Sequence, residues 1–490
     1  MKNKTMMQYF EWYLPENGLH WKRVHAQAKE LKEAGINMVW LPPAYKGANG
    51  KSSVGYDVYD TFDLGEFDQK GTIATKYGTK EEYLQAVAAL QAQEIEVLAD
   101  VVLNHMMGAD ATEEVMVEET ASNNREDEIS GLKPITAWTK FDFPGRNSTY
   151  SDFKWNKSHF SGTDWDDAAK RNGIYRFEGK NWNRETDTEN VNYDYLMGAD
   201  LDTDNLETVK AITDWGRWYM DTVKMDGFRL DAVKHISFDF YKDWLKNVRT
   251  HVGREFFAVG EYWSKELSKM THYLDEVENC MSLFDVTLHF SFLQAATSNG
   301  QFDMRTLFDQ SLVKTRPLNA VTFVDNHDTQ PNQALYSFIP EWFKPIAYAL
   351  ILLRKDGIPC VFYGDYYGIS HDNVRPVKDL KKLIKLRELY AYGDQYDYFD
   401  DPSIVGFTRT GEEEHIDSGM AVLITDSVAG SKRMKVHEKF SGCQFYDALG
   451  HFAEPVLIDA EGYGEFKVAG GSVSVWVPKK VYEKIYTEIQ

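Results

Sequence analysis

The sequence predicts an α/β fold: a (β/α)8 TIM barrel with an inserted β-rich domain after strand 3 and a C-terminal antiparallel β-sandwich. Three observations predict it. Short apolar strands alternate with helices over most of the chain, residues 104–206 interrupt that alternation, and residues 394–490 read as strands alone. The catalytic barrel is therefore expected to comprise residues 1–103 and 207–393.

Eight short apolar segments are the predicted barrel strands. Several are continuous apolar runs, as expected for parallel strands that helices cover on both faces. The eight segments are Met6–Trp12, Asn37–Leu41, Val97–Leu103, Gly227–Asp231, Phe256–Glu261, Ser282–Val286, Ala320–Val324 and Pro359–Tyr363. Between them, apolar residues recur at helical spacing, as in Trp21–Ala34 before Gly35 and in Trp342–Leu353 before Gly357.

Two regions differ from this pattern. The interval Asn104–Asp204 is far longer than an ordinary βα loop of about 2 to 6 residues. It contains short alternating segments, turns and many acidic residues, so we expect an inserted β-rich domain. After Gly393, the segments Ile404–Phe407 and Met420–Ile424 are strand-like, and residues 472–477 alternate Ser or Trp with Val. These features predict the C-terminal sandwich.

The composition limits the possible partners. The chain has 490 residues, 43% of them hydrophobic, and 76 acidic against 54 basic residues give a net charge of -22. A nucleic acid or an anionic membrane needs a basic face, so neither is an expected partner. A neutral substrate or a bound cation fits better, and we expect a monomer. Cys280, Cys360 and Cys443 are too few and too scattered for a disulfide framework.

The sequence also bears on the compartment. The first residues lack the long apolar run of a secretory signal, and Gln8, Glu11 and Trp12 already resemble folded protein. The most apolar stretch, Ile346–Leu353, is too short to span a bilayer. We therefore expect a cytoplasmic protein. The alternative is a signal that was removed upstream of this sequence.

Charged residues end four of the predicted strands. They lie in Asp100–His105, Gly227–His235, Gly260–Trp263 and Phe323–Asp328. Active sites of such barrels lie at the C-terminal ends of the strands. One charged strand end is readily a structural ion pair, but four that converge on one mouth are hard to explain structurally.

The fourth strand carries a candidate nucleophile. Side chains alternate along a strand, so Arg229 and Asp231 face the same way. We expect the Arg229 charge to lower the pKa of Asp231 and keep it ionised, as a nucleophile must be. The alternative is a buried structural Arg–Asp pair, because perturbed pairs often serve structure alone.

The fifth and seventh strands carry the complementary groups. Glu261 lies before Tyr262 and Trp263, and apolar surroundings raise a carboxyl pKa, which suits a general acid. A nucleophilic carboxylate and a protonated carboxyl are the two groups of a retaining glycosidase. Asp328, with His105 and His327, is predicted to stabilise an oxocarbenium-like state and to hold sugar hydroxyls. A single histidine in such a position is more often structural.

Aromatic side chains near these strand ends are candidate stacking surfaces for sugar rings. They are Trp12, Tyr56, Tyr193 and Trp263. Tyr56 is the preferred candidate, because it follows the second strand at the active face. A single aromatic residue is more often part of the core than a sugar platform.

These four segments, in this order, resemble the signature regions of the α-amylase superfamily of glycoside hydrolases. The likeness extends to Asn37–Ala44, Tyr193–Met197, Trp342–Pro345 and Gly471–Val475, which resemble bacterial liquefying-type α-amylases and above all their cytoplasmic members. The resemblance implies Asp231 as nucleophile, Glu261 as acid/base and Asp328 as transition-state stabiliser. It also implies substrate contacts from Tyr56, His105, Arg229, Lys234 and His327, to which we add Trp263.

The resemblance further implies calcium where the barrel meets the inserted domain. Oxygen ligands of the kind found at the matching positions suit calcium. Those positions are Asn104, Asp194, Asp200 and the His235 backbone carbonyl. Secreted relatives use additional aspartates for a neighbouring metal cluster, whereas this chain has Ser161 and Asn183 at those positions. We therefore expect one calcium ion. The alternative is that these are solvated loop carboxylates.

Three functions compete as explanations of this pattern. The first is endo-acting hydrolysis of α-1,4-glucosidic bonds in starch, glycogen and maltodextrins. The second is a 4-α-glucanotransferase or an isomerase on the same fold, which differs in how the acceptor sites exclude water. The third is a non-catalytic glucan-binding barrel, which loss of a catalytic carboxylate would indicate. All three carboxylates are present, so the sequence favours the first.

Overall fold

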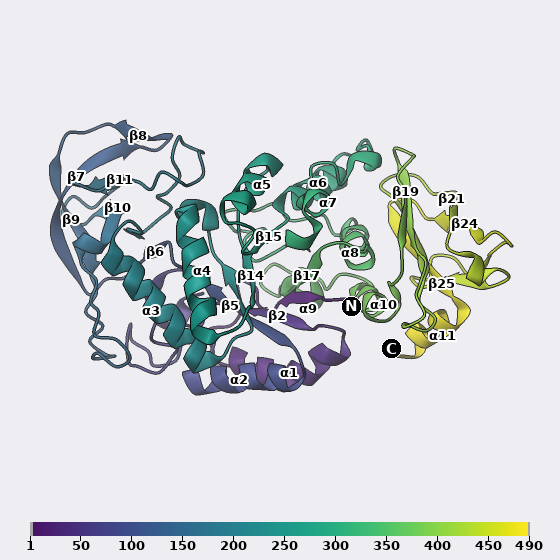
Figure 1. The fold of residues 1–490 in the computed structure, drawn as a ribbon, viewed down its shortest axis with the longest axis horizontal. Coiled ribbons are helices and arrows are strands. Elements are labelled where there is room, and N and C mark those ends of the chain that lie inside the picture. The colour runs from purple at the N-terminus through teal and green to yellow at the C-terminus, as the bar shows by residue number, and fades with distance from the viewer. Residues whose placement is uncertain (1–2, 489–490) are drawn as a thin grey trace.

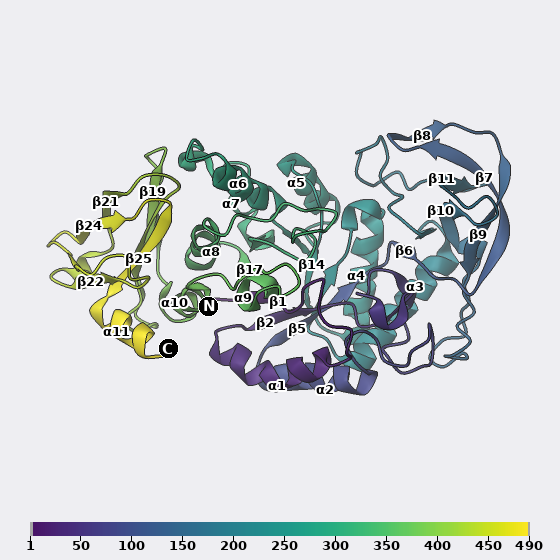
Figure 2. The same ribbon diagram turned by 180° about the vertical axis from the view of Figure 1, so that it is seen from behind.

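A computed structural model describes residues 3–488. Figures 1 and 2 show three parts along the long axis: strands β7 to β11 at one end, the barrel in the middle and strands β19 to β25 at the other end. The N-terminus lies beside the barrel and the C-terminus follows helix α11, Lys479–Glu488.

Eight parallel strands close into a barrel in the order β1-β17-β16-β15-β14-β13-β5-β2. This confirms the predicted (β/α)8 fold. Their bounds are β1 Met6–Gln8, β2 Met38–Leu41, β5 Glu96–Val101, β13 Gly227–Leu230, β14 Phe257–Gly260, β15 Ser282–Phe284, β16 Ala320–Phe323 and β17 Ile358–Phe362. Most are shorter than predicted at the carboxyl end. The first ends at Gln8 rather than Trp12, because the next residues leave the ladder to line the barrel mouth.

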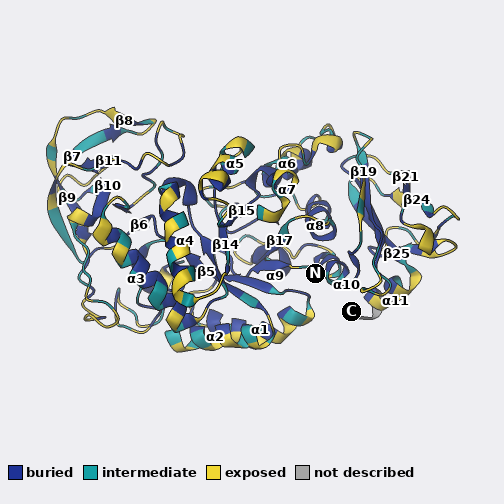
Figure 3. Ribbon diagram, viewed as in Figure 1, coloured by how far each residue is buried: buried dark blue, intermediate teal, exposed yellow. Residues whose placement is uncertain are grey.

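Helices surround the barrel and bury one face each. Figure 3 shows buried strands inside and exposed outer helix faces. The helices are α1 His20–Glu33, α2 Lys80–Ala92, α3 Leu206–Val223, α4 Phe238–Val252, α5 Leu267–Glu276, α6 Val286–Thr297, α7 Leu312–Thr315, α8 Lys344–Leu353, α9 Tyr363–Tyr367 and α10 Leu380–Tyr390. No helix within residues 3–488 is both long enough and apolar enough to cross a bilayer.

Helix α8 begins two residues later than the predicted Trp342. It starts at Lys344 with a proline in its first turn, where the missing N–H removes no helical hydrogen bond. Trp342 lies outside the helix and is 40% exposed. The prediction began the helix at Trp342 because this residue is apolar. In the structure its side chain does not pack on the buried face of α8.

The inserted segment forms an antiparallel sheet of its own. Its order is β6-β12-β10-β11-β7-β8, with β9 on the other edge of β7. The bounds are β6 His105–Met106, β7 Ala111–Ala121, β8 Asn124–Glu128, β9 Lys133–Lys140, β10 Phe160–Asp166, β11 Arg171–Phe177 and β12 Ala199–Leu201. In the β6–β12 pair, His105 lies opposite Asp200. The sheet thus joins the barrel mouth directly.

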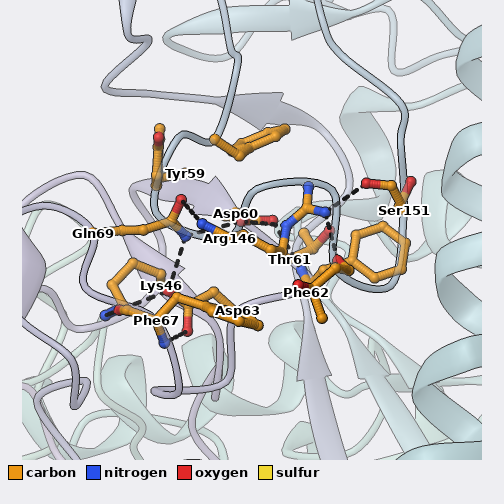
Figure 4. Close-up of polar contacts among 12 residues, drawn as sticks. Lys46, Tyr59, Asp60, Thr61, Phe62, Asp63, Phe67, Gln69, Arg146 and Ser151 are labelled. Atoms are coloured by element: carbon orange, nitrogen blue, oxygen red, sulfur yellow. Dashed lines mark hydrogen bonds and ion pairs between the residues drawn. The ribbon is translucent and has the colours of Figure 1, made fainter.

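A buried polar network fixes the inserted segment to the barrel (Figure 4). The Arg146 guanidinium donates from Nε to the Asp60 carboxylate at 2.8 Å, and both side chains are about 1% exposed. Gln69 donates to Asp60 at 3.0 Å and to Asp63 at 2.9 Å. The buried Lys46 ammonium donates to the carbonyls of residues 67, 72 and 73 and lies 3.4 Å from Asp63. Tyr56 lies in the segment between two short paired strands, β3 (Lys46–Gly47) and β4 (Val58–Asp60). The network therefore shapes the segment that carries Tyr56.

The C-terminal region is an antiparallel sandwich. One sheet has the order β18-β19-β20-β25-β22-β23 and the other pairs β21 with β24. Leu423, Phe466 and Trp476 are fully buried between them. The bounds are β18 Gln395–Tyr398, β19 Ile404–Arg409, β20 Met420–Thr425, β21 Gly430–Lys435, β22 Gln444–Asp447, β23 Val456–Leu457, β24 Tyr463–Val468 and β25 Ser472–Pro478. The predicted strand-like segments lie in β19, β20 and β25.

Candidate active site

Arg229 is the centre of the charged cluster at the barrel mouth. Its Nη1 donates to Asp231 at 2.6 Å and to Asp100 at 2.8 Å, and its Nη2 donates to Glu261 at 2.8 Å. The guanidinium side chain is 1% exposed. Asp231 and Glu261 are therefore held on neighbouring nitrogens of one planar group, with their carboxyl ends facing the mouth.

Strand register explains why these groups meet. Arg229 pairs with Asp100 on β5, and Leu230 pairs with Gly260 on β14, so Glu261 comes next to Asp231. Backbone hydrogen bonds continue past the strands, from Asp231 N to Val101 O and from Glu261 N to Leu230 O, each at 2.9 Å. After Asp231 the chain turns away from the barrel through Ala232, which adopts a left-handed φ of 48°. As predicted, Arg229 and Asp231 share a face.

The pKa of Asp231 differs from the expectation. Burial raises it to about 6, although the charge of Arg229 opposes that rise. Arg229 lowers the pKa as predicted, but the net shift is upward because burial outweighs that charge and the charge of Asp100 adds to the rise. Three buried carboxylates facing one guanidinium cannot all be fully stabilised as anions.

Glu261 has the raised pKa that a general acid requires. Burial raises the pKa of this carboxyl, Arg229 lowers it, and the charge of Asp231 raises it again. Glu261 is 7% exposed. The expected effect of apolar surroundings is thus accompanied by repulsion from a second carboxylate.

Asp328 lies in the loop after β16. Its side chain is 24% exposed, and its Oδ2 lies 3.3 Å from His327 Nε2. Asn326 accepts a hydrogen bond from the Asp328 N–H at 2.9 Å, which fixes the turn. Burial raises the pKa of Asp328 well above its ordinary value, and the Glu261 charge adds to the rise.

Aromatic rings line the mouth beside these carboxyl groups. Trp12, Tyr56 and His327 lie nearly parallel, with Tyr56 5.0 Å from His327 and 6.0 Å from Trp12 between ring centroids. The Tyr56 hydroxyl donates to Asp100 at 2.8 Å. His105 Nε2 lies 2.9 Å from the Tyr56 carbonyl, so His105 holds the backbone that carries the ring.

Lys234 and Trp263 lie farther from the Arg229 cluster. Lys234 pairs with Glu189 at 2.9 Å and lies 4.8 Å from the Tyr193 ring centroid. Its charge still lowers the pKa of Glu261. Trp263 packs in the aromatic group of His289, Phe290 and Phe323, so it is partly a core residue.

Sequence reasoning did not select Asp100 or Gln8 as site residues. Asp100 accepts hydrogen bonds from Trp40 at 2.9 Å, Tyr56 at 2.8 Å and Arg229 at 2.8 Å, so it holds the other groups in place. Gln8 contacts His327 at 2.9 Å. The available signal was a polar residue inside an otherwise apolar barrel strand, which is costly unless the residue has partners.

The candidate calcium ligands also lie close together. Asn104 Nδ2 donates to the His235 carbonyl at 3.2 Å. Asp194 and Asp200 are 2% and 1% exposed, and neither forms an ion pair with a described Lys, Arg or His. Burial raises the pKa of Asp194 to about 7 and that of Asp200 well above normal, and each is influenced by neighbouring carboxylates. Such carboxylates are stabilised by a cation.

Ser161 and Asn183 are hydrogen-bond donors to those two carboxylates. Ser161 Oγ donates to Asp200, and Asn183 donates its backbone N–H to Asp194 at 2.9 Å and its amide at 3.2 Å. Residues 3–488 contain no group of three or more His, Cys, Asp or Glu side chains arranged to hold a metal. The candidate set is therefore two carboxylates, one amide and one carbonyl.

Known proteins resemble this chain over nearly its whole length. A family model described as the α-amylase catalytic domain matches residues 20–393, and one for the α-amylase C-terminal region matches residues 420–477. An α-amylase of Geobacillus stearothermophilus is 55% identical over 481 residues, 98% of this chain and 87% of that protein. A cytoplasmic α-amylase of Escherichia coli (strain K12) is 43% identical over 98% of this chain and all of its own length.

The solved structures support the fold. A crystal structure of an Anoxybacillus α-amylase has a TM-score of 0.66 and covers 97% of each chain. Its identity to this chain is 18%, so it bears on the fold alone.

Proposed function

This chain belongs to the α-amylase family, and we propose that it hydrolyses internal α-1,4-glucosidic bonds of starch, glycogen and maltodextrins with retention of configuration. One observation carries the mechanism: Asp231 and Glu261 bind adjacent nitrogens of Arg229. Retaining glycosidases keep their two carboxyl groups about 5 to 5.5 Å apart, whereas inverting enzymes separate them to admit a water. Because Asp231 and Glu261 share the Arg229 guanidinium, the short separation of a retaining enzyme is favoured.

In the first step Asp231 attacks the anomeric carbon. A carboxylate oxygen forms a bond to that carbon while the bond to the leaving glucosyl oxygen breaks. Glu261 transfers its proton to the leaving oxygen, so the departing chain leaves as a neutral hydroxyl. Arg229 holds both carboxyl groups for this step through the two hydrogen bonds described above.

In the second step the roles of the groups reverse. The ionised Glu261 accepts a proton from water, whose oxygen then displaces Asp231 from the anomeric carbon. Asp328 faces the same mouth and supplies negative charge to the oxocarbenium-like transition states. Two displacements at one carbon return the original α-configuration.

The substrate contacts are assigned to the groups around the mouth. Tyr56 presents a ring face for stacking, and a neutral glucan suits a protein with a net charge of -22. His105 and His327 adjoin this ring, while Lys234 and Trp263 are assigned to sugar units farther along the chain. Arg229 acts mainly through the carboxylates that it binds.

We propose one calcium ion, held by Asn104, Asp194, Asp200 and the His235 carbonyl. Burial lowers the pKa of His105, so the ring is neutral and its single proton goes to the Tyr56 carbonyl. His105 Nδ1 then accepts, and the Asn104 group 3.2 Å away suits it best as the amide NH2. That orientation exchanges the two ends of the Asn104 amide, so that its oxygen takes the place of the Nδ2 that lies 3.2 Å from the His235 carbonyl in the structure. Two such oxygens beside two buried carboxylates suit a calcium ion, which would tie the inserted sheet to the barrel.

We also assign the protein to the cytoplasm and treat it as a monomer. The support for the compartment is the identity of 43% to the E. coli cytoplasmic α-amylase. Fractionation of the native host with antibody detection tests this assignment. A predominantly extracellular pool would contradict it.

The activity is tested by following products from starch and from maltodextrins over time. Endo-acting hydrolysis predicts a rapid loss of iodine staining before small sugars accumulate, with one new reducing end per bond broken. Labelled glucose added as an acceptor should remain largely unincorporated. Efficient incorporation without net reducing ends would identify a glucanotransferase instead.

A further inference from the structure

Gln8 contacts the side chain of His327, which lies at the barrel mouth. It is the last residue of β1, at the carboxyl end of the barrel, and it is 1% exposed. Its Nε2 lies 2.9 Å from His327 Nδ1, and its Oε1 has no hydrogen-bond partner among the described residues. A buried amide oxygen without a partner costs stability. The contact with His327 is therefore the specific polar interaction of this side chain.

His327 is held in a single ring position. It is 1% exposed and lies between Phe10, Trp40 and Tyr56, with ring centroids 5.1, 5.7 and 5.0 Å away. Its opposite nitrogen, Nε2, lies 3.3 Å from Asp328. The ring therefore connects Gln8 on one side to Asp328 on the other.

The His327 ring is neutral and therefore carries one ring proton. Burial lowers the pKa of His327 well below its ordinary value, and the nearby Arg229 charge lowers it further. The groups that face the ring are Arg229 from β13, Tyr56 from the segment after β2, and Asp328 on its own loop. A neutral imidazole donates from one nitrogen and accepts at the other.

We propose that Gln8 is a positioning residue that fixes the Nε2–H tautomer of His327, so that the protonated nitrogen faces the Asp328 carboxylate 3.3 Å away. The inference rests on the proposed function of Asp328. The Gln8 amide donates to Nδ1, which leaves the ring proton on Nε2. In the opposite arrangement, Nε2 would present a lone pair to the carboxylate of Asp328, and the two would repel each other.

The consequence concerns the transition state. The positive end of the His327 Nε2–H bond, 3.3 Å from the Asp328 carboxylate, stabilises the ionised form of Asp328. Burial and the Glu261 charge raise the pKa of that carboxyl group. Asp328 must be an anion to stabilise the positive charge that develops on the sugar ring. Gln8 thus acts on catalysis through His327 without touching the substrate.

The direct test is the tautomer itself. ¹⁵N-histidine labelling of the whole protein gives signals from 13 histidines, and a His327→Asn variant identifies those of His327. We expect a protonated Nε2 and an unprotonated Nδ1 at neutral pH. A protonated Nδ1 in the wild-type protein overturns the proposal. This readout needs no activity, so it separates the proposal from a failure of the proposed hydrolysis.

Kinetics of Gln8→Met, Gln8→Glu and the control Met6→Leu give the functional test. Met6 lies on the same strand and points to the same face as Gln8. Gln8→Met should lower kcat about 10-fold with little change in KM, as for loss of one hydrogen bond. Met6→Leu should leave kcat unchanged. If Gln8→Met lowers only the melting temperature, with kcat equal to that of the control, the proposal is wrong.

Gln8→Glu adds a signature that a structural role does not produce. The introduced carboxyl group, when protonated, still donates to Nδ1, whereas its ionised form accepts from Nδ1 and draws the ring proton away from Nε2. The variant should therefore match the wild-type kcat at low pH. As the pH rises and the introduced carboxyl group ionises, kcat should fall, which adds a limb to the pH profile. A pH profile equal to that of the wild type overturns the proposal.

Discussion

Arg229 sets the electrostatics of the site at the scale of single residues. It binds Asp100, Asp231 and Glu261, so one positive charge is shared among three buried carboxyl groups. The sequence predicted the Arg229–Asp231 pairing from strand alternation. It could not predict the net pKa, because that depends first on how deeply Asp231 is buried and then on Asp100, which comes from another strand and reaches Arg229 only when the barrel closes.

Replacing either central carboxyl group should abolish turnover while leaving the fold intact. We expect Asp231→Asn and Glu261→Gln to lower kcat by about 10⁴-fold or more, because each removes a group that acts in the transition state. Glu261→Gln should lose least with substrates whose leaving group needs no proton, because only the first step is spared and the attack of water still lacks its base. The matched control is Asp243→Asn, an exposed residue of α4. Near-normal kcat with a lowered melting temperature would identify the pair as structural.

The acid limb of kcat/KM should reflect Asp231. This ratio reports groups of the free enzyme. Burial raises the pKa of Asp231 to about 6, and only the ionised form attacks, so kcat/KM should fall as the pH drops through about 6. Glu261 must stay protonated, which makes the profile bell-shaped. An acid limb near the ordinary Asp value of about 4 would contradict this assignment.

At the scale of elements, local patterns predicted the barrel better than they predicted the inserted sheet. Each barrel strand is a short apolar run with a helix after it, so composition and spacing were sufficient to predict the barrel strands. The β6–β12 pairing joins residues far apart in the chain, and no local signal sets that register. Tyr56 was chosen for its position after β2, whereas its contact with Asp100 depends on how the whole segment folds.

The contact between Arg146 and Asp60 should be the main electrostatic link between the inserted sheet and the barrel. Arg146→Met leaves Asp60 buried without its charge partner, which typically costs about 3 to 5 kcal/mol. The comparison is Arg171→Met, which breaks the half-exposed Arg171–Glu119 pair. Urea unfolding should show a large loss for Arg146→Met and a much smaller one for Arg171→Met. Equal losses would mean that burial of the pair is unimportant.

At the scale of the whole molecule, the junction of the inserted sheet with the barrel holds two buried carboxyl groups, Asp194 and Asp200. Asp194 and Asp200 are buried without a basic partner among the described residues, close to the strand that carries Asn104. Only the resemblance suggested this set from sequence, because its members are separated by most of the inserted segment. A bound cation would stabilise the folded chain by mass action.

Removal of that cation should lower activity and stability together. We expect one calcium ion per chain in dialysed protein, and a melting temperature that rises with calcium concentration. Ser161 and Asn183 supply neutral donors where a second ion would need anionic ligands. Metal analysis that finds two or more ions would disprove the single site. Unchanged melting and full activity in excess chelator, with no metal left, would show that calcium has no role.

The stereochemistry of the first product tests the double displacement most directly. Proton NMR of a maltodextrin digest, recorded before mutarotation equilibrates the anomers, distinguishes the two forms of the new reducing end. Attack by Asp231 followed by attack of water predicts the α-anomer first, with the β-anomer appearing only as mutarotation proceeds. Initial appearance of the β-anomer would show a single displacement by water and would contradict the assignment of Asp231 as the nucleophile.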